Sequence, residues 1–162
     1  INWLTSYSLY ADDLNDWYKN NISSEWIKRR KEALEILQRE AELQEIVQLI
    51  GYDALPEPEK GILDTARSIR EDYLQQSAYD EIDTYSSIKK QYLMLSTILE
   101  FGKKESEAIK KGISSSKIGS LEVKKRISMI KWTREDQVER LVKEIEINMQ
   151  EQFNNLLMEV TL

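Results

Sequence analysis

Residues 41–59, AELQEIVQLIGYDALPEPE, join two long helical patterns that we expect to run in opposite directions. Apolar residues recur at helical spacing over residues 25–50, and Gly51 predicts the end of that helix, because glycine readily takes the left-handed conformation found after helix ends. The loop 52–59 is short and acidic and holds both prolines of the chain. Since a second helical pattern follows over residues 58–76, we predict an antiparallel helical hairpin with a stiff acidic tip.

The rest of the chain also shows helical spacing. We predict further helices over residues 7–19, 88–111, 121–130 and 133–159, with a connector over 77–87. The positions expected to face inward in the two longest helices are Trp26, Ala33, Leu34, Leu37, Ala41, Leu43, Ile46, Val47 and Ile50, and Val138, Leu141, Val142, Ile145, Met149, Phe153, Leu156 and Val160. The first of these stripes drifts round the helix axis, so that helix should touch more than one neighbour.

These patterns predict an all-α fold, a helical bundle of about five to six helices with a long antiparallel helical hairpin. Residues 1–162 should form a single domain. The chain starts at Ile1 rather than Met, so we expect a piece excised from a longer protein. Neither a signal peptide nor an apolar stretch of about 20 residues occurs, so we expect no direct membrane insertion.

The composition excludes several classes of function. The chain has no histidine and no cysteine, which excludes disulfides, thiolate nucleophiles, zinc fingers and Ser-His-Asp catalysis. Its 23 Lys and Arg against 29 Asp and Glu give a net charge of -6, which argues against nucleic acid as a partner. Neither GxGxxG nor GxxxxGK[ST], the glycine motifs that bind phosphates, is present. We expect no metal site.

Adjacent carboxylates offer one possible kind of chemistry. They occur at Asp12-Asp13, Glu71-Asp72, Asp80-Glu81 and Glu135-Asp136. A hydrolase could use two of them, but acidic pairs are more often solvated helix faces. We therefore predict no catalytic residue in this chain.

Two further features have two interpretations each. Tyr73 and Tyr79 flank Ala78 where the second hairpin helix should end, and two aromatic faces around a small residue could sandwich a flat ring such as adenine. From composition alone, the interpretation that both rings belong to the core is favoured. The acidic tip, residues 53–59, is either a solvated turn or a tip that its prolines stiffen enough to press on a partner.

Five runs carry a resemblance to a known family: INWLTSYS at 1–8, AELQEIVQLIGYDALP at 41–56, IREDYLQQ at 69–76, DTY at 83–85 and KQYLML at 90–95. Together they resemble the C-terminal region of the catalytic A subunit, or alpha chain, of archaeal-type and vacuolar-type rotary ATP synthases. The resemblance is dense from Ile1 to about Phe101 and looser from Gly102 onward.

The resemblance implies a helical domain that follows a nucleotide-binding domain, which would precede residue 1 and hold the phosphate loop and the catalytic groups. It implies that Tyr73, Ala78 and Tyr79 form the adenine side of the nucleotide pocket, and that closing this pocket tilts the hairpin. It also implies a contact between the tip and the central rotor shaft. The tip residues are Asp53, Ala54, Leu55, Pro56, Glu57, Pro58 and Glu59.

Further implications concern the whole protein. It would be the enzyme, making or hydrolysing ATP coupled to proton or sodium transport, and would bind ATP or ADP with Mg. Its partners would be the non-catalytic B subunits and the rotor shaft, in a head that lies in the cytoplasm as a peripheral part of the membrane complex. The present segment alone should be inactive and bind no nucleotide, because it lacks the phosphate loop.

Two other interpretations remain open from the sequence. One is a free-standing helical adaptor whose acidic hairpin tip docks a basic partner. The other is a small carboxylate-dependent hydrolase, which needs two inward-facing carboxylates in a pocket.

Overall fold

The computed structural model describes residues 25–74 and 88–161, and within these ranges every regular element is a helix. The α-helices are α2 (Glu25–Ile50), α3 (Glu57–Ser68), α5 (Ile88–Lys110), α6 (Ser115–Gly119), α7 (Glu122–Ser128) and α8 (Glu135–Thr161). Short 3-10 turns cover Tyr52–Ala54 and Ile130–Trp132, and a π-helical turn covers Ile69–Leu74. The predicted all-α bundle with a long hairpin is confirmed. The expected helix at 7–19 and connector at 77–87 lie outside the described residues.

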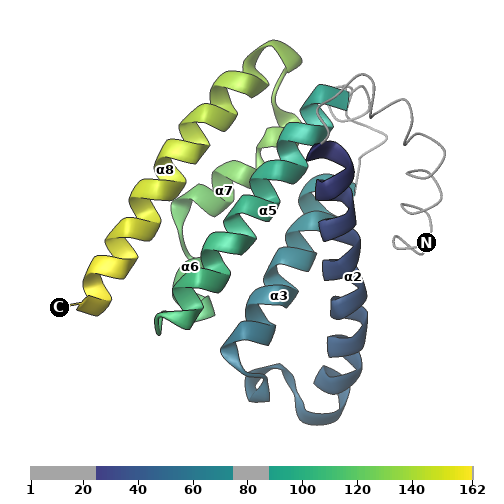
Figure 1. The fold of residues 1–162 in the computed structure, drawn as a ribbon, viewed down its shortest axis with the longest axis vertical. Helices are drawn as coiled ribbons and strands as arrows, with labels where there is room; N and C mark the ends of the chain where they lie inside the picture. The colour runs from purple at the N-terminus through teal and green to yellow at the C-terminus, as the bar shows by residue number, and fades with distance from the viewer. Residues whose placement is uncertain (1–24, 75–87, 162) are drawn as a thin grey trace.

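The helices form one bundle in which α5 is central. Figure 1 shows α2 and α3 side by side as the antiparallel hairpin, with their connection at the bottom of the view and α8 at the far left. Helix α5 packs against α2, α3 and α8, while α6 contacts α3 and α5, and α7 contacts α5 and α8. The hairpin is therefore attached to the rest of the bundle mainly through α5. The expectation that the first hairpin helix touches more than one neighbour is confirmed.

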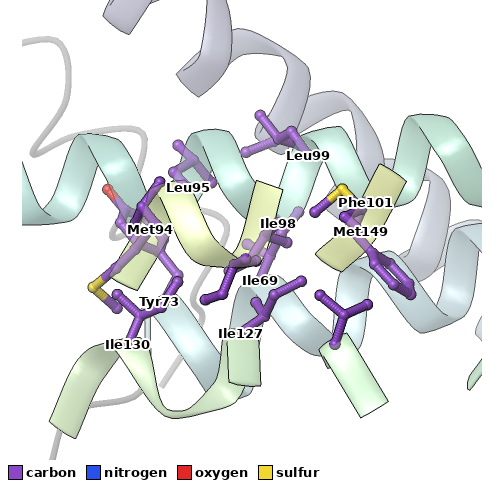
Figure 2. Close-up of a cluster of buried hydrophobic side chains, with 14 of the residues drawn as sticks. Ile69, Tyr73, Met94, Leu95, Ile98, Leu99, Phe101, Ile127, Ile130 and Met149 are labelled. Atoms are coloured by element: carbon purple, nitrogen blue, oxygen red, sulfur yellow. The ribbon is translucent and has the colours of Figure 1, made fainter. Parts of the chain in front are cut away.

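The core is one large apolar cluster drawn from all these helices. Figure 2 shows Ile69 and Tyr73 meeting Met94, Ile98, Ile127 and Ile130, with Phe101 and Met149 farther along. Phe101 meets Phe153 of α8 edge-on, with ring centroids 5.3 Å apart. Burial of this apolar surface is the main force that holds the bundle together.

The apolar stripes of α2 and α8 were predicted correctly over most of their length and wrongly toward their C-terminal ends. In α2, Trp26, Ala33, Leu37 and Leu43 are buried, but Ala41, Ile46 and Ile50 are exposed. The reason is that the far end of the hairpin reaches past the other helices (Figure 1), so only α3 remains to cover α2 there. In the same way, Val160 in the last turn of α8 is 50% exposed.

Two local structures differ from the expected helices. The second hairpin helix continues beyond Ser68 as a π-helical turn rather than as a plain α-helix. A short helix, α6, lies between the predicted helices 88–111 and 121–130, where none was predicted. The Oγ of Ser114 caps α6 by accepting the backbone N–H of Lys117 at 3.3 Å, which is the usual role of a serine before a helix.

Helices α3 and α5 approach closely because two glycines line their crossing. A Cβ atom added at Gly102 would lie 2.7 Å from Oγ1 of Thr65, and one added at Gly61 would lie 2.9 Å from Cδ1 of Ile109. The Thr65 hydroxyl is buried and donates to the Gly61 carbonyl at 3.2 Å. No side chain larger than hydrogen fits at either glycine without a shift of its neighbours.

Candidate functional site

The hairpin tip is compact because its backbone bonds close on themselves. The N–H of Gly51 still donates to the Val47 carbonyl at 2.8 Å, and the N–H of Leu55 donates to the Tyr52 carbonyl at 3.0 Å. Gly51 has a φ of 85°, as predicted, but its ψ of 155° lies outside the left-handed helical region. That combination is essentially restricted to glycine, so the residue type at position 51 fixes how the chain leaves α2.

One predicted tip residue points inward. Leu55 is 5% exposed and packs with Leu43 and Leu63, with Val47 and Ile62 at the edge of this small cluster. Its neighbours Pro56 and Pro58 start α3, where a missing N–H costs no helical hydrogen bond. The turn is therefore anchored by an apolar cluster on its inner side, and the two prolines restrict its backbone.

The acidic residues of the tip divide into one tethered group and two that face outward. Glu57 accepts the backbone N–H of Ser115 at 2.7 Å, and its carboxylate lies 3.8 Å from the Lys60 ammonium. The hydrogen bond from Ser115 is the main reason that the pKa of Glu57 is lowered. Asp53 is exposed and Glu59 is partly exposed, and among the described residues neither carboxylate has a hydrogen bond or ion pair of the kind that holds Glu57.

An apolar surface lies beside the acidic tip, and the sequence analysis missed it. The hairpin-end patch consists of Ile46, Leu49, Ile50 and Tyr52, which are 38%, 85%, 55% and 43% exposed. A signal was present in the sequence, because apolar residues at 46, 47, 49 and 50 occupy more of the helix circumference than one neighbour can cover. The end of the hairpin therefore combines apolar side chains with outward carboxylates.

An ion pair braces the two helices of the hairpin. The Nε of Arg70 donates to both oxygens of the Glu40 carboxylate, at 3.0 and 3.2 Å, and its Nη2 donates to Oε2 at 2.8 Å. Glu40 is 9% exposed, so its carboxylate is largely removed from water, whereas the Arg70 side chain is 35% exposed. A bidentate pair of this kind fixes the relative orientation of the two side chains in addition to balancing their charges.

The predicted adenine-side residues are only partly described. Tyr73 lies in the π-helical turn, 8% exposed and packed into the core. Ala78 and Tyr79 lie outside the described residues. Beside Tyr73, burial raises the pKa of Asp72, and the positive charge of Lys131 opposes that shift. The described part thus shows Tyr73 anchored in the core by its side chain.

A buried carboxyl pair inside the bundle was not predicted. Glu105 of α5 is 1% exposed and lies near Asp64 of α3, and its Oε2 is buried without a hydrogen-bond partner in the described part of the chain. Burial, followed by the charge of Asp64, raises the pKa of Glu105 to about 8, while Lys124 of α7 opposes the shift. The cavity beside the pair measures only about 10 Å³, so it has room for about one water and not for the substrate of a hydrolase.

The other candidate sites of the described residues offer less for binding or catalysis. An open groove of about 560 Å³ runs between α2, α3 and α5, above the glycine crossing. Two arginines on its rim already pair within the chain, Arg29 with Glu32 and Glu100, and Arg39 with Glu42. Over residues 25–74 and 88–161, no three acidic side chains come together as a metal site would need, and no helix has the length and apolarity to cross a bilayer.

Comparison of the sequence with known proteins identifies the family to which the chain belongs. Residues 15–118 match the family model described as the C-terminal domain of V and A type ATP synthase. Curated relatives named as the A subunit of A-type ATP synthases are 48% identical over 161 residues in Methanopyrus kandleri and 48% identical over 158 residues in Methanococcus maripaludis. A third, from Thermococcus onnurineus, is 47% identical over 154 residues.

The matched region is a part of each relative. The alignments cover 99%, 97% and 94% of the present chain, but 27%, 27% and 26% of the relatives from Methanopyrus, Methanococcus and Thermococcus. The chain thus spans about a quarter of the length of these relatives. The described segment from Gly119 onward lies beyond the family model but within the matches to these proteins.

Proposed function

Because this chain belongs to the family of C-terminal domains of V- and A-type ATP synthases, we propose that its hairpin couples the nucleotide pocket of the whole protein to a central rotor shaft. The observation that carries the proposal is the continuity of one element. Helix α3 and its π-helical turn run without a break from Glu57 at the tip to Tyr73 and Leu74 in the core. A displacement at one end is therefore transmitted to the other.

The hairpin has the stiffness that a lever needs. The eighteen residues from Glu57 to Leu74 span about 25 Å at the rise of a helix. The Glu40–Arg70 pair locks α3 to α2 near the Tyr73 end, and the cluster around Leu55 locks the helices at the tip. A rigid pair of helices rotates as one body, so a small tilt at the core becomes a larger movement at the tip.

The surface at the tip indicates the chemistry of the partner. The hairpin-end patch offers apolar contact area, and Asp53 and Glu59 add negative charge next to it. A rotor shaft that receives this end would present apolar side chains flanked by basic ones. Of the predicted contact residues 53–59, Leu55 contributes by holding the turn rather than by touching the shaft.

At the other end of the lever, Tyr73, Ala78 and Tyr79 would form the adenine side of the pocket. The chain itself has no glycine-rich phosphate loop, so it fits only the base of a nucleotide. The whole protein would bind ATP or ADP with Mg and catalyse the making or hydrolysis of ATP. The isolated segment would be inactive and bind no nucleotide. Its partners would be the non-catalytic B subunits and the rotor shaft. The assembled head would lie at the cytoplasmic face of the membrane.

The proposal is tested in the assembled complex by changing the hairpin-end patch. The double variant Leu49→Ser, Ile50→Ser removes the two most exposed apolar side chains of the patch. We expect the number of ions transported per ATP hydrolysed, measured in proteoliposomes, to fall more than the rate of hydrolysis itself. The matched control is Ile147→Ser, since Ile147 is 67% exposed on α8, away from the hairpin.

Unchanged coupling in the double variant would contradict the proposed contact between the hairpin and the rotor shaft. Equal loss of coupling in the Ile147→Ser control would show that any lost apolar surface has this effect. A loss confined to the hairpin-end patch supports the contact with the rotor.

A further inference from the structure

The π-helical turn that carries Tyr73 is held from a distant part of the chain. The Lys131 ammonium donates to the Glu71 carbonyl at 2.7 Å, across 60 residues of sequence. The Glu71 carbonyl belongs to the backbone of the π-helical turn, and a hydrogen bond from a charged ammonium is stronger than one from a neutral donor. Lys131 therefore satisfies a backbone group of the turn itself and does not merely pair with a neighbouring side chain.

Lys131 is in turn fixed by a buried lysine of α5. The Lys90 ammonium donates to the Lys131 carbonyl at 2.9 Å and to the Thr133 carbonyl at 2.8 Å. Lys90 is 1% exposed, and a buried ammonium is tolerated only where it is well hydrogen-bonded. The short segment between α7 and α8 thus bonds to α5 through its backbone and to the π-helical turn through the Lys131 side chain.

Apolar packing supports the same contact from the other side. Figure 2 shows Ile130 beside Tyr73 and Met94, and Ile127 farther along, near Ile69, in the same core cluster. Ile130 is 1% exposed and Ile127 is 4% exposed. The turn is therefore held by packed side chains on one face and by the Lys131 bond on its backbone.

We propose that Lys131 is a positioning residue for the adenine side of the nucleotide pocket, holding the π-helical turn so that Tyr73 keeps the place from which it meets the base. Lys90 supports it by fixing the backbone on which Lys131 stands. This inference rests on the proposed function. It gives a role to the segment between α7 and α8, which lies beyond the family match at 15–118. A displacement of Tyr73 by about 1 Å can strongly weaken its contact with the bound base.

The test uses the whole ATP synthase complex with Lys131→Met, which keeps the apolar stem and removes the donor. Two quantities are compared: the KM for ATP and the inhibition constant of inorganic tripolyphosphate, which has the phosphates without the base. We expect the KM for ATP to rise roughly three- to tenfold, while the inhibition constant and kcat stay close to those of the unmodified complex. Lys131→Arg should restore the KM, because it keeps a charged donor.

Controls separate a positioning role from a general loss of structure. Lys125→Met removes an exposed lysine of the neighbouring helix α7 and should leave both constants unchanged. If Lys131→Met leaves the KM for ATP unchanged, or alters the ATP and tripolyphosphate constants alike, the inference is overturned. Lys131→Gln, a milder variant with a neutral donor, gives the same readout should the methionine variant fail to assemble.

Tyr79→Ala in the same complex distinguishes a failure of the proposed function from a failure of the role given to Lys131. If Tyr79→Ala leaves the KM for ATP unchanged, the adenine side has been assigned wrongly and the proposed function fails with the inference. If Tyr79→Ala raises the KM while Lys131→Met does not, only the inference fails.

Discussion

Glu40 and Arg70 join the two helices of the hairpin through three hydrogen bonds between residues 30 positions apart in the sequence. The Arg70 side chain is 35% exposed, and the Glu40 side chain is 12% exposed. Arg70 stands in the π-helical turn, three residues before Tyr73. The pair thus connects the body of the lever to the part of the chain proposed to meet the nucleotide.

We expect Arg70→Met to lower the free energy of unfolding of the 162-residue chain by about 2–3 kcal/mol, because it leaves the Glu40 carboxylate buried without its partner. Urea denaturation measures this change. Arg39→Met is the matched control. Its pair with Glu42 is equally short, at 2.8 Å, but exposed, so its loss should cost no more than about 0.5 kcal/mol. Equal losses in the two variants would contradict the role of the brace.

Gly102→Ala should lower the free energy of unfolding by about 1–2 kcal/mol, although alanine favours a helix more than glycine does. The added Cβ would lie within 2.8 Å of both Oγ1 and Cγ2 of Thr65, which forces α3 and α5 apart. Thr65→Ala in the same chain should recover part of the loss. Gly119→Ala, where the nearest atom is Oδ2 of Asp64 at 4.0 Å, should change stability little. Thermal or urea unfolding of these variants checks this.

Stability should depend on pH through Glu105. Its pKa is raised from the ordinary 4.5 to about 8, first by burial and then by Asp64, with Lys124 opposing. The folded chain therefore keeps a proton that the unfolded chain releases, so the contribution of this group to the free energy of unfolding falls as the pH rises from 4.5 to about 8.

Glu105→Gln, which cannot ionise, should remove this part of the pH dependence. Its gain over the unmodified chain should be larger at about pH 8.5 than at about pH 5, by an amount of the order of 2 kcal/mol. Urea unfolding at both pH values measures it, and Glu107→Gln, an exposed change on the same helix, should run parallel to the unmodified chain. A gain that is the same at both pH values would show that Glu105 does not hold the proton.

Tyr73 contributes to folding as well as to the proposed pocket. Tyr73→Ala should lower the free energy of unfolding by about 3–5 kcal/mol, because it empties a buried aromatic site. Tyr73→Phe keeps the ring and should cost much less. Circular dichroism during heating separates the two variants. A small loss in Tyr73→Ala would mean that the ring is not packed in the core and would change its assignment.

Much of the fold could be predicted from the sequence because helical spacing is a local property. The first hairpin helix was predicted to end at Ile50, as observed. The inward positions Val138, Val142, Ile145, Met149 and Phe153 of the last helix are buried as predicted. The π-helical turn and α6 were not predicted. Both carry hydrogen bonds that a spacing pattern does not contain, such as the cap from Ser114 and the bond from Lys131 to the Glu71 carbonyl.

The candidate site was predicted in part. The acidic tip and its stiffening prolines follow from residue types at 53–59. The hairpin-end patch does not, since the exposure of Leu49 and Ile50 depends on where the other helices end. The pocket residues Ala78 and Tyr79 stay predictions, because they lie outside the described residues.

The helices, the glycine-terminated hairpin and the family all follow from the amino-acid order alone, because each depends on local spacing, single residue types or long matched runs. Which polar groups are buried, and which apolar ones stay outside, depends instead on how the helices pack. Glu105, Lys90 and Glu40 are buried because another helix covers them, and Leu49 is exposed because none does. Burial depends on neighbours distant in the chain, and a helical period contains no information about them.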